Sequence, residues 1–201
     1  MLCGHCVLMP AWNLVMEAFL ISTGIVALAE IGDKTQLLSL VLAARFRKPW
    51  PIVWGILVAT LANHAMAGAA GAFVTTVLGP AVLRWVLGGS FLAMAAWMLV
   101  PDKLDEGDAG KVLRLGVFGT TLVAFFLAEM GDKTQIATVM LAARFNVWLP
   151  VVLGTTLGMM VANVPVVWLG ERITRLVPLR IVHVVSAVIF GALGVAALVW
   201  G

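Results

Sequence analysis

Two short charged segments hold the residues of this sequence whose types and spacing could do chemistry: AEIGDKTQ at 29–36 and AEMGDKTQ at 128–135. In each segment a glutamate and an aspartate stand three positions apart, so on a helix they would share one face. A threonine and a glutamine follow. Carboxylate, hydroxyl and amide oxygens suit Mg²⁺, Ca²⁺ or Mn²⁺, whereas Zn²⁺ and copper sites favour cysteine and histidine, which neither segment contains. The predicted metal ligands are Glu30, Asp33, Gln36, Glu129, Asp132 and Gln135.

A glycine lies between the two acids of each segment. Because glycine has no side chain, it would permit either close backbone approach or a break in the helix, and a break would free carbonyl oxygens for a cation. Each segment also carries a lysine. Four carboxylates and two lysines would sum to minus two if all were ionised, which one divalent cation would neutralise. Supporting roles are predicted for Gly32, Gly131, Lys34, Lys133, Thr35, Thr134, Asn63 and Asn163.

Composition places these charges in a membrane. The chain is 62% apolar and 11% charged, whereas a soluble domain is about half apolar and about a quarter charged. We therefore expect an integral membrane protein whose surface contacts the lipid bilayer. The net charge of +3 is small and suggests no nucleic-acid partner.

Six long apolar segments can position the charged residues. Prolines mark most of the joints between them, where helices should end. The predicted fold class is an all-α integral membrane protein of six transmembrane helices, in which the first and fourth carry the charged segments, lie centrally and are broken. The apolar segments cover residues 14–44, 51–78, 81–100, 114–143, 149–170 and 179–200.

The charged segments fall near the middle of the first and fourth apolar segments. A charge at the centre of a spanning helix costs roughly 2.5–3.5 kcal/mol. Six such charges facing lipid would cost on the order of 15–20 kcal/mol, which rivals the total stability of a typical domain. They must instead face one another or a wet cavity.

The two halves of the chain are a repeat. At an offset of 99 residues, positions 28–46 match positions 127–145 at 13 of 19 places, and an Ala-Asn pair follows in each half. Three spans per half is an odd number, so the second half would enter the membrane inverted. The predicted organisation is a leader at 1–13, repeats at 14–100 and 114–201, and a linker at 101–113.

Loop charges predict the orientation. Outside the two motifs, the lysines and arginines divide unevenly between the two faces, and the positive-inside rule makes the richer face cytoplasmic. Both termini would then be periplasmic and the linker cytoplasmic. The richer face would carry Arg45, Arg47, Lys48, Lys103, Lys111, Arg114, Arg172, Arg175 and Arg180, and the other face only Arg84 and Arg144.

Structural explanations compete with these functional ones. A Glu30–Lys34 pair could be a buried ion pair alone, although its duplication argues for a functional site. His64 could relay protons or could be a hydrogen-bonded packing residue. Cys3 and Cys6 form CGHC, which also occurs as a redox motif, but no βαβ pattern follows it, and an unstructured leader is the favoured interpretation.

The paired E-x-G-D-K-T motifs resemble those of the Gdt-type, MneA-like family of manganese and calcium transporters, which is grouped with the LysE-like superfamily. The resemblance covers the chain from about Trp12 to Trp200. It implies Mn²⁺ export, or Ca²⁺/H⁺ and Mn²⁺/H⁺ exchange, at the acidic residues of the motifs. The short chain and minimal loops favour a bacterial exporter of the inner membrane.

The expected function is therefore secondary-active export of Mn²⁺, or Ca²⁺, in exchange for protons, at a midplane carboxylate site shared by the two repeats. The transported cation would be a substrate, with no cofactor and no enzymatic activity. Three alternatives stay open on the sequence: an intramembrane aspartyl hydrolase using Asp33 and Asp132, an amino-acid exporter, and a passive cation channel.

Overall fold

The computed structural model describes residues 11–100, 115–170 and 179–200, and within these ranges the chain forms helices and no strands. The predicted all-α class is confirmed. The leader cysteines Cys3 and Cys6 and the whole of the linker at 101–113 lie outside the described residues. The described helices are α1 (Ala11–Glu30), α2 (Lys34–Phe46), α3 (Pro49–Val77), α4 (Pro80–Trp97), α5 (Gly116–Glu129), α6 (Lys133–Phe145), α7 (Trp148–Leu169) and α9 (Leu179–Trp200).

Each predicted apolar segment is helical to within about three residues of its predicted ends. Prolines begin α3 and α4, where the missing N–H would have had no partner. The first and fourth segments are each divided into two helices at the charged motif, so the predicted breaks are present. Among the described residues, α1, α3, α4, α7 and α9 are long and apolar enough to cross a membrane, whereas α5 has only 14 residues.

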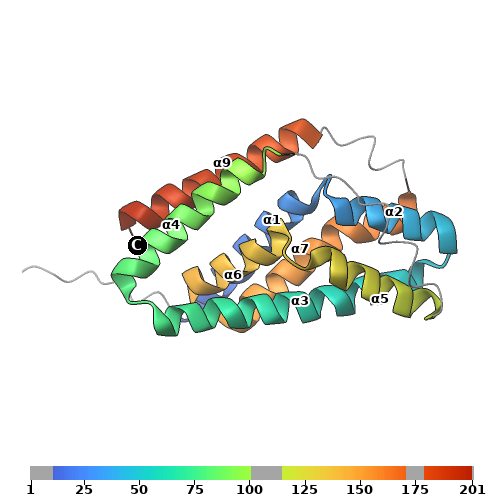
Figure 1. Ribbon diagram of the computed structural model, residues 1–201, viewed down its shortest axis with the longest axis horizontal. Coiled ribbons are helices and arrows are strands. Elements are labelled where there is room, and N and C mark those ends of the chain that lie inside the picture. The colour runs from blue at the N-terminus through green and yellow to red at the C-terminus, as the bar shows by residue number, and fades with distance from the viewer. Residues whose placement is uncertain (1–10, 101–114, 171–178, 201) are drawn as a thin grey trace, which may run out of the picture.

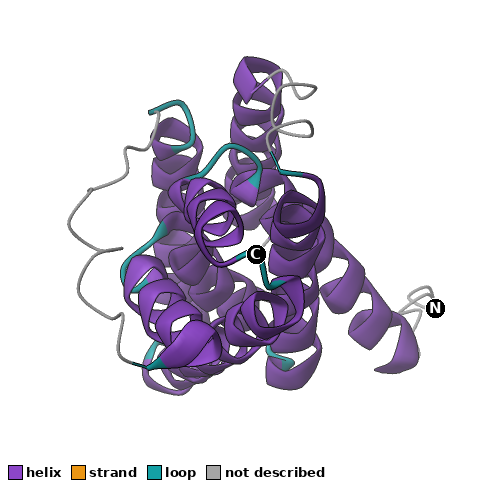
Figure 2. Ribbon diagram, turned by 90° about the vertical axis from the view of Figure 1, so that its right-hand side faces the viewer, coloured by secondary structure: helices purple, strands orange, loops and turns teal. Residues whose placement is uncertain are grey.

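Helices of the first half of the chain pack mainly against helices of the second half. Helix α1 packs chiefly along α7, and α3 packs along α5, α6 and α7, so the main partners of these helices belong to the other half. Helices α4 and α9 lie side by side (Figure 1). In the perpendicular view the helices are seen nearly end on and gather into one bundle (Figure 2). The motif-bearing segments therefore meet through contacts between residues about a hundred positions apart.

Glycines make these contacts close. A Cβ on Gly55 of α3 would lie 2.7 Å from Thr121 Cβ of α5, and one on Gly154 of α7 would lie 2.5 Å from the Phe19 carbonyl oxygen of α1. Gly71, in the small-residue run of α3, faces the Val139 backbone of α6 without room for a side chain. Small residues commonly let membrane helices approach in this way.

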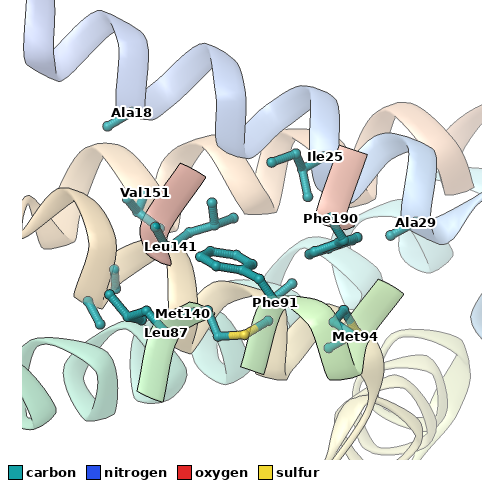
Figure 3. Packing of buried hydrophobic residues seen from close by; sticks show 14 of the residues in the cluster. Ala18, Ile25, Ala29, Leu87, Phe91, Met94, Met140, Leu141, Val151 and Phe190 are labelled. Atoms are coloured by element: carbon teal, nitrogen blue, oxygen red, sulfur yellow. The ribbon is translucent and has the colours of Figure 1, made fainter. Parts of the chain in front are cut away.

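An apolar cluster fills the space between α4, α9 and the rest of the bundle (Figure 3). Phe91 and Phe190, which are 99 positions apart, pack with ring centroids 6.2 Å apart. Both are about 1% exposed. The cluster connects the α4–α9 pair to α1, α6 and α7, and so supports the helices that carry the motifs.

Candidate metal-binding site at the two helix breaks

The two breaks have the same local geometry. Gly32 and Gly131 take positive φ angles of 85° and 75°. The amide of the following aspartate then donates to the carbonyl oxygen of the glutamate, at 3.1 Å in both motifs. One helix of each pair therefore ends at a glutamate, and the next begins after an aspartate.

The glycines are needed for backbone conformation. A Cβ on Gly131 would meet nothing within 4 Å, so the expectation of close approach at this position is wrong. Its φ lies in the left-handed region, which costs residues with a Cβ roughly 1–2 kcal/mol. The alternative expectation, a break in the helix that needs a positive φ, accounts for glycine at position 131.

The glutamines hold the breaks together. Gln36 Oε1 accepts a hydrogen bond from the Gly32 amide at 2.9 Å, and Gln135 Oε1 accepts one from the Gly131 amide at 2.7 Å. This resembles a capping box, in which a side chain in the first helical turn satisfies an amide before the helix. The oxygens of both glutamines, which were predicted as metal ligands, thus accept a hydrogen bond in this structure, and an amide oxygen keeps a second lone pair.

Three carboxylates converge from the two motifs. Oxygens of Glu30, Asp33 and Asp132 all lie within 4.8 Å of one another, and the three residues are buried. We call these three residues the carboxylate cluster. Both aspartates precede a helix, yet neither side chain caps it. Their carboxylates therefore point to the cluster rather than to the amides of their own helices.

Glu129 is buried beside this cluster but is not part of it. Its Oε2 accepts a hydrogen bond from Thr134 Oγ1 at 2.9 Å. The equivalent Thr35 Oγ1 is buried and makes no such bond with the described residues. The two motifs, alike in sequence, are therefore arranged differently.

Several buried carboxylate oxygens are unsatisfied. Glu30 Oε2, Glu129 Oε1 and Asp132 Oδ2 have no hydrogen-bond partner among the described residues. Buried polar atoms are normally bonded, and an unpaired buried carboxylate is costly. Oxygens of this kind, gathered at one place, can bind a cation.

The two predicted asparagines reach across the halves. Asn63 of α3 accepts a hydrogen bond from Gln135 Nε2 at 3.3 Å and donates to the Phe126 carbonyl oxygen at 3.0 Å. Asn163 of α7 donates to Glu30 Oε1 at 3.4 Å. Each asparagine thus contacts the motif of the opposite repeat, which makes them positioning residues in this structure.

Sequence reasoning missed two contacts of Asn163. Ser39 Oγ donates to Asn163 Oδ1 at 2.8 Å, and Asn163 Nδ2 lies 3.0 Å from Met159 Sδ. Ser39 and Thr138 are equivalent at the 99-residue offset, so both repeats carry a hydroxyl at this place. This shared hydroxyl is the sequence signal that could have identified Ser39 as a partner of Asn163.

Both motif lysines reach beyond their own helices. Lys34 Nζ lies 3.2 Å from Asp132 Oδ1 of the other motif. Lys133 Nζ donates to the Val100 carbonyl oxygen, beyond the end of α4. His64 is buried, and neither ring nitrogen has a hydrogen-bond partner among the described residues, so the interpretation as a hydrogen-bonded packing residue is not supported there.

The chain is similar to known proteins over most of its length. The family model described as "Divalent cation/proton antiporter GDT1" matches residues 18–106 and 117–201. The chain is 52% identical over 177 residues to a "Putative manganese exporter" of Vibrio cholerae serotype O1, with 88% of each protein covered. It is 28% identical over 194 residues to "GDT1-like protein sll0615" of Synechocystis, covering 88% of this chain and 94% of that protein. No solved structure matches the chain.

Proposed function

Because the chain belongs to the GDT1 family of divalent cation/proton antiporters, we propose that it exports Mn²⁺, or Ca²⁺, across a bacterial inner membrane in exchange for protons. The family consists of transporters, so the chain is not an enzyme, the cation is a substrate rather than a cofactor, and the aspartyl-hydrolase alternative is set aside. The observation that carries the proposal is the buried carboxylate cluster drawn from both motifs.

The chemistry of the donors supports a hard divalent cation. Glu30, Asp33 and Asp132 supply the charged oxygens, and Glu129 supplies a fourth carboxylate when its bond to Thr134 opens. Manganese is favoured over calcium because of the 52% identity to a protein named for manganese export. The glutamine oxygens complete the shell as neutral ligands.

The depth of the site fits a transporter. Helix α3 has 29 residues, about 44 Å at 1.5 Å per residue, and so exceeds the thickness of the hydrocarbon core. Asn63 is its central residue, and it is bonded to Gln135 of the second motif. The site accordingly lies near the bilayer midplane, where secondary transporters commonly bind substrate.

An inverted repeat would expose this site to each side in turn, and contacts that recur at the 99-residue offset support it. Gly55 faces Phe118 and Thr121, and Gly154 faces Phe19 and Ser22, which are the equivalent residues. The repeats are residues 14–100 and 114–201, each with three spans, joined by a cytoplasmic linker at 101–113. Both termini lie in the periplasm.

Proton exchange follows from the ligands. A carboxylate must be deprotonated to bind a metal, so metal binding releases protons and proton binding displaces metal. In the proposed cycle the carboxylates take up Mn²⁺ while the site faces the cytoplasm. After the metal is released outside, the carboxylates carry protons while the site returns to face the cytoplasm.

Flux measurements in proteoliposomes test the proposal. We expect Mn²⁺ movement to be driven by an imposed pH gradient, with Ca²⁺ transported less well and Mg²⁺ least. Flux that follows the metal gradient alone and ignores the pH gradient would indicate the passive channel instead. Amino-acid flux without metal flux would indicate the exporter of amino acids.

A further inference from the structure

A cavity of about 170 Å³ lies between α4, α6 and α9, and none of its lining residues belongs to either motif. It is formed where α4 begins and where α6 and α9 approach their ends. All three helices reach the end of the bundle at which the C-terminus lies (Figure 1). Two arginines line the cavity, Arg84 of α4 and Arg144 of α6, and its other lining residues are apolar. We call it the arginine cavity.

The arginine cavity gathers positive charge without an acidic partner. Arg84 and Arg144 are the two basic residues outside the motifs that the loop-charge analysis places on the poorer face. In the described ranges of the chain neither arginine forms an ion pair with a carboxylate. Two guanidinium groups at one cavity repel each other, so an anion between them would stabilise the arrangement.

The Arg84 side chain has hydrogen-bonding capacity to spare. Its Nε is buried and has no hydrogen-bond partner among the described residues. Its guanidinium carbon lies 5.4 Å from the centroid of the Trp85 ring, a contact that leaves the charge in place. A buried N–H is normally bonded, because leaving it unpaired away from water costs free energy. The guanidinium can therefore donate to an acceptor that is not part of the chain.

The surroundings of the cavity indicate where such an acceptor comes from. Helices α4 and α9 are long and apolar enough to cross a membrane, and arginines close to the end of a spanning helix lie at the level of the lipid headgroups. Beside the lining residues, Val82 and Trp85 of α4 and Val199 of α9 are more than half exposed. A molecule bound here meets guanidinium groups and an apolar surface together, which matches a phospholipid.

We propose that the arginine cavity binds the phosphate of an anionic phospholipid headgroup, with Arg84 and Arg144 as the donors. Arginine pairs with phosphate through two parallel N–H···O bonds, and basic pockets between membrane helices bind anionic headgroups. A lipid held by both arginines connects the α4–α9 pair with α6, the helix that begins directly after Asp132. This inference goes beyond the proposed function and does not depend on it.

Native mass spectrometry of the purified full-length protein tests the inference, with phosphatidylglycerol as the probe and phosphatidylcholine of the same acyl chains for comparison. Phosphatidylglycerol should bind about tenfold more tightly, because choline brings its own positive charge. Arg84→Gln and Arg144→Gln should each weaken phosphatidylglycerol binding about tenfold, since each removes charge-assisted bonds to the phosphate. The Arg144 side chain is exposed, so its replacement should leave the fold intact.

Arg45→Gln is the matched control. Arg45 is equivalent to Arg144 at the 99-residue offset and also lies in the last turn of its helix, but it does not line the cavity. Its replacement should leave phosphatidylglycerol binding at the wild-type value. Equal affinity of the wild type for the two lipids, or equal weakening by Arg45→Gln, would overturn the inference.

Two further measurements complete the test. Arg84→Lys keeps the charge but loses the planar fork, so it should bind phosphatidylglycerol with intermediate affinity, and it serves if Arg84→Gln does not fold. Inorganic phosphate added in large excess should not displace the lipid, because it offers no acyl chains. Binding of inorganic phosphate that depends on both arginines, without binding of phosphatidylglycerol, would show that the cavity takes a soluble anion and that the lipid assignment is wrong.

Discussion

Replacement of Glu30 by glutamine, compared with the same replacement of Glu129, tests whether the carboxylate cluster alone binds the metal. Glutamine keeps the size of the side chain, and its oxygen can still accept the hydrogen bond that Asn163 donates to Glu30 Oε1. Glu30 is fully buried, so the substitution removes a charge without leaving a cavity. At 4 Å and an effective dielectric constant of about 20, one carboxylate attracts a divalent ion by roughly 8 kcal/mol before desolvation is counted. Removing one partner of a buried charge pair costs about 3–5 kcal/mol net.

That cost corresponds to Mn²⁺ binding weaker by more than about a hundredfold. Glu129→Gln is the matched variant: Glu129 is equally buried but lies outside the cluster, bonded to Thr134. In this conformation it should weaken binding much less, while transport is still abolished because the cycle needs both motifs. Titration calorimetry and proteoliposome flux measure the two quantities. Wild-type affinity in Glu30→Gln, or normal flux in Glu129→Gln, would refute the reasoning.

Three further predictions concern the scaffold. Gly131→Ala should destabilise the protein by roughly 1–2 kcal/mol because residue 131 has a positive φ. Gly24→Ala, in the middle of α1 where an added Cβ would meet nothing within 4 Å, should stabilise the protein by about 0.5–1 kcal/mol. Thermal unfolding in detergent compares the two variants, and equal effects would contradict the backbone argument. Ser39→Ala leaves Asn163 Oδ1 without its 2.8 Å hydrogen bond and should lower stability by about 1–3 kcal/mol, so an unchanged melting temperature would show that another group replaces the hydroxyl. A periplasm-sensitive reporter should be active at the C-terminus and inactive at 101–111, and the reverse pattern would invert the proposed topology.

Much of the fold was predictable because its signals are local. Long apolar runs, prolines at the joints and the duplicated GDKTQ motif are each read within a few residues, and the helices begin and end close to the predicted positions. The broken motif helices were also predictable, since glycine between two charges in an apolar segment marks a place where a regular helix is disfavoured.

The choice of cluster members was not predictable in the same way. The motifs are nearly identical, so nothing local distinguishes Glu30, which joins the cluster, from Glu129, which bonds to Thr134. Nor could the sequence assign the glutamine oxygens to the glycine amides, because a glutamine four residues after a glycine has many possible partners.

The sequence by itself determined that the chain is a duplicated membrane protein with hard oxygen donors inside apolar segments, because composition and periodicity carry that information residue by residue. The tertiary structure decided which donors meet. That outcome depends on packing between helices about a hundred residues apart, where Gly55 and Gly154 permit close approach. Two copies of one motif can therefore differ only through their neighbours, and those neighbours are defined by the folded chain.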